Sequence, residues 1–199
     1  MLYHELAWTY DLVAWLVSFG QWKAWGRAAI PRLRGPRVLE LAHGPGHLLV
    51  AMTRAGFTPV GLDLSPQMGR LAQAGLRRVS SPVSAPGLVR ARAQAMPFRS
   101  GMFDSVVSTF PAEFIVQAET LKEIARVLKN DGCAVVVPGV EFKQSLAARF
   151  LEWLYTVTGQ QEPVPSGFAD AFAEAGLMLT IEREPLGMVE VLVAVATKK

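Results

Sequence analysis

Two carboxylates and a glycine turn could together hold a cationic ligand that carries a ribose. Glu40 ends a short apolar run, and the turn His43-Gly44-Pro45-Gly46 follows almost directly. A carboxylate at the end of a buried strand is costly unless it meets a cationic or donor partner, and it would repel a phosphate. A glycine turn before a helix brings a ligand close to backbone N–H groups. Asp63 ends the next apolar run and can accept two hydrogen bonds from ribose hydroxyls.

The segments that must position these residues alternate between strand-like and helix-like patterns. Strands are expected at 38–42, 58–62, 88–91, 103–109 and 133–137, and helices at 47–54, 66–78 and 117–128. Ser65 before Pro66 is a typical helix start. Alternation of this kind predicts a parallel, doubly wound sheet, in which ligands bind outside the carboxyl ends of the strands. This rule gathers the glycine turn, Asp63 and the loops 93–98 and 109–114 around one crevice.

Both ends of the chain depart from this alternation. Residues 4–34 are rich in aromatics, with a spacing typical of one or two amphipathic helices that break near Gly20 and stop near Pro31. Towards the other end we expect helices at 143–156 and 167–175, a loop at 158–165, and strands at 177–183 and 188–196. The connection Pro185-Leu186-Gly187 is short enough for a hairpin, so the last two strands should be antiparallel.

Four segments resemble, in order, the motifs of class I S-adenosylmethionine-dependent methyltransferases. They are VLELAHGPGHLL at 38–49, VGLDLSPQM at 60–68, the loop and strand at 93–98 and 102–108, and LKEIARVLKNDG at 121–132. The antiparallel last strand also matches that family and not the dehydrogenases. The start of the chain, around Tyr10 and 18–22, is similar to that of quinone-biosynthesis C-methyltransferases, where this segment helps to close the cofactor pocket.

The resemblance implies a fold and a division of the chain. The expected fold is a single α/β domain of three αβα layers, with a Rossmann-like, seven-stranded mixed sheet whose last strand is antiparallel. Within residues 1–199 we expect an N-terminal helical lid at 1–35, a cofactor-binding core at 36–140, and C-terminal helices and a hairpin at 141–199.

The resemblance also implies cofactor contacts for individual residues. Glu40 would face the methionine amino group, and Asp63 would hold the ribose. The turn residues would line the methionine part (Ala42, Gly44, Gly46), and Phe110 would lie near the transferable methyl. Around the adenine ring, Leu64 and Met68 would pack on its face, and Ala93 and Gln94 would meet its polar edge. Tyr10 would belong to the lid, although it could equally be plain packing. Departures from the family are Ala42, His43 and Pro45 in the turn and Arg92, where an acidic residue often reads the adenine amino group. They leave Gln94 as the polar candidate.

The expected function is methyl transfer from S-adenosylmethionine to a small or lipophilic acceptor. Because the leaving group is neutral and good, alignment supplies much of the rate, and no catalytic side chain is predicted. Glu113 could act as a base or simply favour a helix start. The alternative is a non-catalytic module that binds S-adenosylmethionine or S-adenosylhomocysteine. An NAD-linked oxidoreductase is disfavoured by Glu40 and by Leu49, which stands where the dinucleotide motif has its third glycine.

Composition limits the remaining possibilities. No charge-free stretch approaches the roughly 18 apolar residues of a spanning helix, and no signal peptide is apparent, so a cytoplasmic protein is expected. Cys133 lies in an apolar run, His43 and His47 are interpreted as packing or solvated, and no metal site is expected. Net charge +3 does not suggest nucleic-acid binding, and Thr109-Phe110-Pro111-Ala112 is unlike the Asn-Pro-Pro-Tyr type of amino-methylating enzymes. Six arginines lie between Asp63 and Asp104 with no acidic residue among them. They are interpreted as a solvated basic face or as an edge that makes weak contact with an anionic membrane surface or an acidic partner (Arg70, Arg77, Arg78, Arg90, Arg92, Arg99). The oligomeric state is not predicted.

Overall fold

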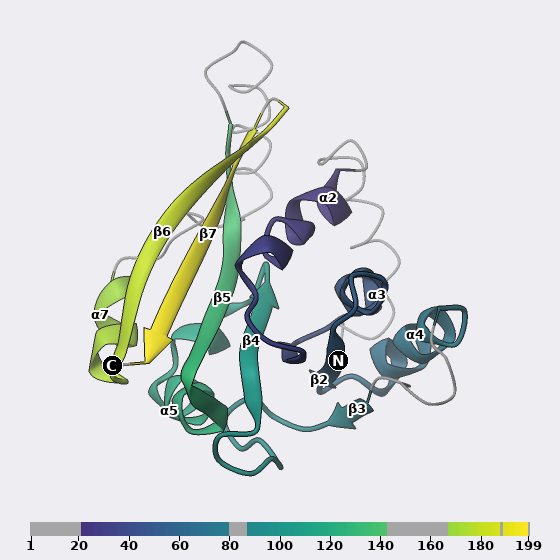
Figure 1. The fold of residues 1–199 in the computed structure, drawn as a ribbon, viewed down its shortest axis with the longest axis horizontal. Helices are drawn as coiled ribbons and strands as arrows, with labels where there is room; N and C mark the ends of the chain where they lie inside the picture. The colour runs from purple at the N-terminus through teal and green to yellow at the C-terminus, as the bar shows by residue number, and fades with distance from the viewer. Residues whose placement is uncertain (1–20, 80–86, 143–166, 188, 199) are drawn as a thin grey trace, which may run out of the picture.

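A seven-stranded sheet organises the described residues, which are 21–79, 87–142, 167–187 and 189–198 of this computed structural model (Figure 1). The strand order is β3-β2-β1-β4-β5-β7-β6. The bounds are β1 Arg37–Leu41, β2 Thr58–Asp63, β3 Gly87–Arg90, β4 Phe103–Thr109, β5 Leu128–Phe142, β6 Leu177–Leu186 and β7 Val189–Lys198. Strands β1 to β5 pair in parallel, whereas β7 runs antiparallel to both β5 and β6. The predicted mixed sheet with an antiparallel last strand is confirmed.

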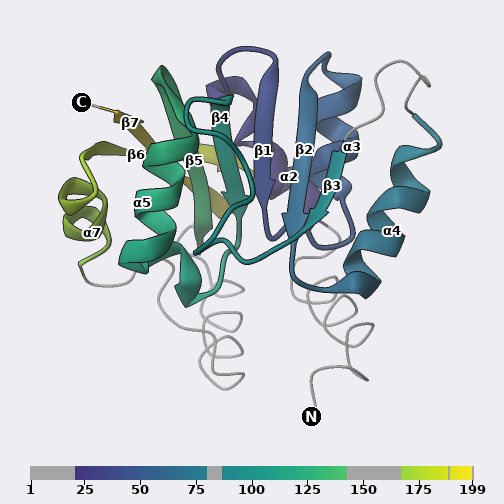
Figure 2. The ribbon, with the colours of Figure 1, turned by 90° about the horizontal axis from the view of Figure 1, so that it is seen from below.

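Helices cover both faces of the sheet (Figure 2). Their bounds are α2 Trp22–Arg27, α3 His47–Arg54, α4 Pro66–Leu76, α5 Ala118–Val127 and α7 Phe168–Glu174, with 3-10 turns η1 Ile30–Arg32 and η3 Glu113–Val116. One apolar cluster joins α5 and α7 to the sheet, and a second joins α2, α3 and α4 to its other face. Successive residues of a strand point to opposite faces, so Leu39 belongs to the first cluster and Val38 to the second. The three αβα layers follow from this alternation.

The sequence-predicted core elements are present with small changes at their ends. Helix α3 has the expected bounds, and α4 starts as predicted, with the Ser65 hydroxyl accepting a hydrogen bond from the Met68 N–H at 3.4 Å. The helix expected at 167–175 is also present as α7. The helix predicted at 143–156, the loop at 158–165, Tyr10 and the rest of 1–20 lie outside the described residues.

Strand β5 differs most from expectation. It was expected at 133–137, but it starts at Leu128, directly after α5. Pairing with β4 jumps from Phe103↔Leu128 to Ser105↔Cys133, so the intervening residues of β5 form a bulge. The strand also continues beyond Val137 to Phe142, because β7 supplies partners for this extension.

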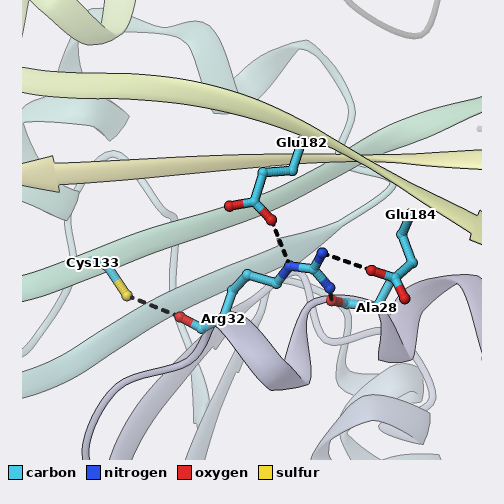
Figure 3. Close-up of polar contacts among 5 residues, drawn as sticks. All are labelled: Ala28, Arg32, Cys133, Glu182 and Glu184. Carbon is cyan, nitrogen blue, oxygen red and sulfur yellow. Dashed lines mark hydrogen bonds and ion pairs between the residues drawn. The ribbon is translucent and has the colours of Figure 1, made fainter.

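Arg32 fastens the N-terminal segment to the edge of the sheet (Figure 3). Its guanidinium donates to Glu182 at 3.0 Å and to Glu184 at 2.7 Å, both on β6, and to the carbonyl of Ala28 at 3.0 Å. The Cys133 thiol, buried in β5, donates to the carbonyl of Arg32 at 3.5 Å. The turn η1 is thereby fixed against strands that come much later in the sequence.

Among the described residues, no helix has the length and apolar character needed to cross a bilayer.

Candidate functional site

The candidate site lies where the strand order reverses, between β1 and β4. From β1 the chain adds β2 and then β3 on one side, and it adds β4 on the other side. In a doubly wound sheet, the crevice at the carboxyl ends of such strands is the usual place for a ligand. Ala42 and Phe110 directly follow β1 and β4, and they are the non-glycine residues with positive φ in the described part of the chain, at 52° and 49°. Such strain costs about 1–3 kcal/mol per residue and clusters at functional sites.

The two strand ends are held side by side. The register pairs Glu40 with Val107, and the Ser108 hydroxyl donates to the carbonyl of Leu41 at 3.0 Å. The Phe110 N–H donates to the carbonyl of Val137 at 2.7 Å, which turns the chain away from β4. Both segments therefore leave the sheet at the same edge, where ligands usually bind in doubly wound sheets.

The glycine turn after β1 adopts the left-handed conformation that its residues require. Gly44 and Gly46 have φ of 52° and 80°, and a Cβ on Gly44 would meet no atom of the described residues within 4 Å. A Cβ on Gly46 would lie 2.7 Å from the Cβ of Ala72, so this glycine also permits close packing of α3 on α4. Open space above Gly44 leaves its backbone accessible to a ligand, whereas the α-carbon of Gly46 faces helix α4.

His43 is part of the packing of this turn. Its side chain is buried, its Nδ1 lies 2.7 Å from the carbonyl of Gly44, and a Cβ on Gly61 would approach its Cδ2 to 2.7 Å. This placement agrees with the interpretation of His43 as a packing residue.

Asp63 links the two turns that border the crevice. One carboxylate oxygen accepts the Gly44 N–H at 2.9 Å, and the other accepts the Ser65 N–H at 2.8 Å. The side chain is only half-buried, and each carboxylate oxygen has a second lone pair. Asp63 can therefore fix the glycine turn and still accept hydrogen bonds from a pair of ribose hydroxyls.

Glu40 is buried without full compensation. It is 2% exposed, and its Oε2 has no hydrogen-bond partner among the described residues. Burial raises the pKa of Glu40 well above its usual value, the charge of Asp63 raises it further, and a backbone hydrogen bond from Leu49 lowers it. An orphaned acceptor in a buried position is costly, and a cationic donor would remove that cost. An ammonium group of a ligand would meet this requirement.

The residues expected at the adenine ring differ in exposure. Leu64 is 56% exposed although it is apolar, and Met68 on α4 is half-buried. The Arg90 guanidinium donates to the carbonyl of Leu64 at 3.0 Å. Ala93 is buried in the core, so it supports the loop after β3, while Gln94 is half-buried and donates to Gln117 Oε1 at 2.6 Å. These side chains come from the turn after β2, from α4, from the end of β3 and from the loop that follows it.

An aromatic pair that sequence reasoning did not predict borders the β4 side of the crevice. Trp22 of α2 stacks on Phe110, with ring centroids 3.8 Å apart and an interplanar angle of 28°. A Cβ on Gly26 of α2 would lie 3.7 Å from the Thr109 side chain, so this helix crosses the end of β4. The only signal for this pair in the sequence was the richness of residues 4–34 in aromatics, which did not show which tryptophan meets Phe110.

Glu113, a candidate base, is exposed in the first turn of η3.

Comparison with known proteins identifies the family. A family model described as a methyltransferase domain matches residues 39–136. A ubiquinone/menaquinone biosynthesis C-methyltransferase of Geotalea uraniireducens (strain Rf4) is 37% identical over 145 residues, which are 68% of this chain and 60% of that protein. The chain belongs to the S-adenosylmethionine-dependent methyltransferases. A second relative with the same description, from Photorhabdus laumondii, is 32% identical and covers 74% of this chain and 60% of its own length.

Solved structures share the fold of this chain. A S-adenosylmethionine-dependent methyltransferase from Thermotoga maritima superposes with a TM-score of 0.69 at 17% identity and covers 100% of both chains. Geranyl diphosphate C-methyltransferase from Streptomyces coelicolor gives a TM-score of 0.66 at 14% identity, covering 88% of this chain and 79% of that one. The chain spans about 60% of the length of the two curated relatives.

Proposed function

We propose that this chain binds S-adenosylmethionine and transfers its methyl group to a small, lipophilic acceptor in the cytoplasm. The observation that carries the proposal is the buried Glu40 carboxyl, whose Oε2 lacks a partner among the described residues at the crevice between β1 and β4. A phosphate-bearing dinucleotide would be repelled there, whereas an ammonium would be attracted and would supply N–H donors.

The residues present suit each part of that cofactor. Glu40 would hold the methionine ammonium, and Asp63 would accept the ribose hydroxyls while its backbone donors keep it in place. The exposed side chain of Leu64 offers an apolar surface for the adenine ring, with Met68 beside it on the same chain segment. The backbone from Ala42 to Gly44, accessible because of its turn, would line the methionine part. Tyr10, expected at the lid, is outside the described residues and remains a proposal.

Catalysis needs little from side chains in this proposal. When bound, S-adenosylmethionine supplies an electrophilic methyl on a sulfonium whose departure leaves a neutral thioether. The protein's part is to align the acceptor with that methyl and to exclude water. Phe110, with its strained backbone, and its stacking partner Trp22 are suited to this alignment. One ring follows β4 and the other comes from α2, and their stacking fixes the two segments relative to each other. Glu113 stays an open candidate for a base if the acceptor is acidic.

An apolar acceptor is supported by the side chains beyond the aromatic pair. Trp22 and Phe110 are half-buried, as are Val140 of the β5 extension and Leu186 of β6, and all four pack on the same apolar cluster. The relatives named for ubiquinone and menaquinone biosynthesis, and the neighbour named for geranyl diphosphate, act on lipophilic molecules by their names. A planar or isoprenoid acceptor is therefore the class we favour.

Calorimetric titration tests the cofactor proposal. Wild-type protein should bind S-adenosylmethionine and S-adenosylhomocysteine, and not NAD, and Asp63→Ala should abolish both interactions. Asp170→Ala is the matched control, since Asp170 is an exposed aspartate on α7 that has no expected cofactor contact. Binding of NAD alone would overturn the proposal. Binding of both adenosyl ligands without turnover of any acceptor in a screen of quinols, phenols and isoprenoids would instead favour the non-catalytic module.

We also propose weak contact with an anionic membrane surface. The six arginines between Asp63 and Asp104 are all exposed, and they lie on α4 and just after it, on β3 and in the following loop (Arg70, Arg77, Arg78, Arg90, Arg92, Arg99). Basic clusters attract anionic lipid, and the attraction falls with salt. Co-sedimentation with vesicles should rise with phosphatidylglycerol content and fall with added salt. Binding that ignores both variables, or no binding at all, would leave these residues as a solvated face.

A further inference from the structure

We propose that Glu123 and Arg126 of α5 are positioning residues for the adenine side of the cofactor site. They would act through the loop at 91–102, which joins β3 to β4. The proposal rests on the cofactor assigned above and goes beyond it, because neither residue is expected to touch the cofactor. It names the part of the protein that gives this loop its shape.

The loop needs support from outside itself. It has no helix or strand between Arg90 and Phe103, although parallel strands are usually joined through a helix. It starts beside Asp63, since the register pairs Asp63 with Arg90. Figure 2 shows that it then runs from β3 across the sheet to α5 before it enters β4. Its first residues therefore lie at the ligand-binding edge, and its later residues lie against α5.

Two side chains of α5 bind the backbone of the loop at several points. The Glu123 carboxylate accepts the Met96 N–H at 2.6 Å. The Arg126 guanidinium donates to the carbonyl of Met96 at 3.0 Å and to that of Phe98 at 2.7 Å. The backbone carbonyl of Arg126 accepts the Gly101 N–H at 2.9 Å. These contacts satisfy backbone N–H and C=O groups of the loop, which have no helix or strand to pair them.

The two side chains also hold each other. Arg126 Nε lies 2.5 Å from one carboxylate oxygen of Glu123, and Nη2 lies 2.8 Å from the other. Fork-to-fork pairs of this kind fix geometry as well as charge. The hydrogen bond from Arg126 lowers the pKa of Glu123, and the same bond raises the pKa of Arg126. Both groups are thus charged at neutral pH and keep the loop in one arrangement.

A third residue near the start of α5 orients the polar side chain of the loop. Gln117 accepts the amide N–H of Gln94 at 2.6 Å. Since the amide nitrogen of Gln94 is engaged, its carbonyl oxygen is the group left to accept a hydrogen bond. The exocyclic amino group of adenine is such a donor, whereas neighbouring Arg92 has donors alone. Gln117 would therefore select the adenine base by the orientation that it gives to Gln94.

The loop retains other anchors when the ion pair is removed. Ala93 and Met96 are buried in the apolar cluster, and Phe98 packs edge-on against Phe103 with centroids 5.0 Å apart. Loss of one charged contact should loosen the loop without unfolding the protein. Because the variants should stay folded, a change in their affinity for the cofactor product would report the position of the loop.

The test compares binding of S-adenosylhomocysteine with binding of its 6-oxo analogue, S-inosylhomocysteine, by calorimetry. Glu123→Gln and Arg126→Gln should each weaken S-adenosylhomocysteine binding about tenfold, as expected for one lost interaction of about 1.4 kcal/mol. The double variant should lose little more, because the two residues act as a unit. Amide exchange at 95–101 should accelerate in the same variants. Gln117→Ala, a surface change, should lower the preference for the adenine ligand about threefold.

Arg183→Gln is the matched control. It breaks the ion pair between Arg183 and Glu141, where the nitrogen and oxygen are 3.1 Å apart, in the hairpin region. It should change neither affinity nor loop exchange. The inference is overturned if folded Glu123 and Arg126 variants bind S-adenosylhomocysteine as tightly as wild type, or if the control weakens binding equally. If wild-type protein binds neither ligand, it is the proposed function that fails, and loop exchange still reports whether α5 shapes the loop.

Discussion

Asp63 has backbone donors on both carboxylate oxygens, whereas the neighbouring buried carboxyl of Glu40 has one oxygen without a partner among the described residues. The two groups lie at or near the ends of the adjacent strands β1 and β2, and the charge of Asp63 raises the pKa of Glu40 further above the value that burial alone produces. The arrangement is unfavourable in the free protein and favourable once a cation lies at Glu40. The buried Glu40 carboxyl therefore lowers the stability of the free protein and should raise its affinity for a cationic ligand.

Glu40→Gln should separate these two effects. The folded protein holds the Glu40 proton more tightly than the unfolded chain does, so the wild type loses stability as pH rises from about 4.5 through the raised pKa. The variant lacks this loss, so its melting temperature should exceed that of wild type by more at pH 8 than at pH 5. Each kcal/mol gained corresponds to about 2–4 °C. Binding of S-adenosylhomocysteine should fall in the same variant.

Glu174→Gln is the control for this pH series. Glu174 is an exposed carboxyl on α7, so its replacement should leave the pH dependence of melting unchanged. Wild-type and Glu40→Gln melting curves that stay parallel from pH 5 to 8 would show that the Glu40 carboxyl is not destabilising in the free protein.

Ala42→Gly should stabilise the fold. Ala42 has a φ of 52°, a conformation that costs an ordinary residue about 1–2 kcal/mol and costs glycine almost nothing. Glycine loses more entropy on folding, so we expect a net gain of about 0.5–1 kcal/mol in the free energy of unfolding, measured in urea. Ala74→Gly, at an exposed position inside α4, should instead lose about 1 kcal/mol. Equal losses in both variants would mean that Ala42 is not strained.

The local patterns of the sequence were sufficient for much of the cofactor side. The buried strand before Glu40, the left-handed glycine turn, and the Ser65-Pro66 helix start are all set by residues within one turn of the feature they specify. The strand and helix bounds in this region accordingly agree with expectation to within a residue or two. Cofactor roles for the individual side chains stay predictions.

Features that depend on distant partners were not predictable. Strand β5 continues through Pro138 and Gly139, which interrupt any strand pattern, because β7 pairs with the residues beyond them. The contacts of Trp22 with Phe110 and of Arg126 with the loop carbonyls join segments with no local relation in sequence. An arginine at the end of a helix gives no sign of which carbonyl it will meet.

Arg32→Gln should weaken the attachment of the N-terminal segment. Arg32 contacts two carboxylates while its own side chain is 17% exposed, so the two ion pairs are better shielded than an isolated surface pair. Its loss leaves Glu182 and Glu184 without their cation, and we expect about 1–2 kcal/mol lower stability by urea unfolding. The difference from wild type should shrink in 1 M salt. Arg183→Gln, which breaks a more exposed pair, should lower stability less than Arg32→Gln does; a larger loss there than at Arg32 would contradict the prediction.

Trp22→Ala should impair acceptor binding while sparing the cofactor. Trp22 contributes one of the two stacked rings beside the end of β4, so its removal opens the apolar surface on which a planar acceptor would lie. With 2-naphthol as the probe and S-adenosylhomocysteine at saturation, affinity should fall about tenfold, in keeping with about 0.5–1.5 kcal/mol for an aromatic pair beyond the buried area. Trp22→Phe should retain part of the affinity.

The specificity of that effect depends on a second aromatic in the same apolar cluster. Phe57 is also half-buried, but it precedes β2 and so lies at the amino edge of the sheet, opposite the crevice. Phe57→Ala should lower stability and leave 2-naphthol affinity at the wild-type value. If both alanine variants weaken the probe alike, the loss comes from general loosening of the cluster. If only Trp22→Ala does so, with S-adenosylhomocysteine affinity unchanged, the acceptor lies against the aromatic pair.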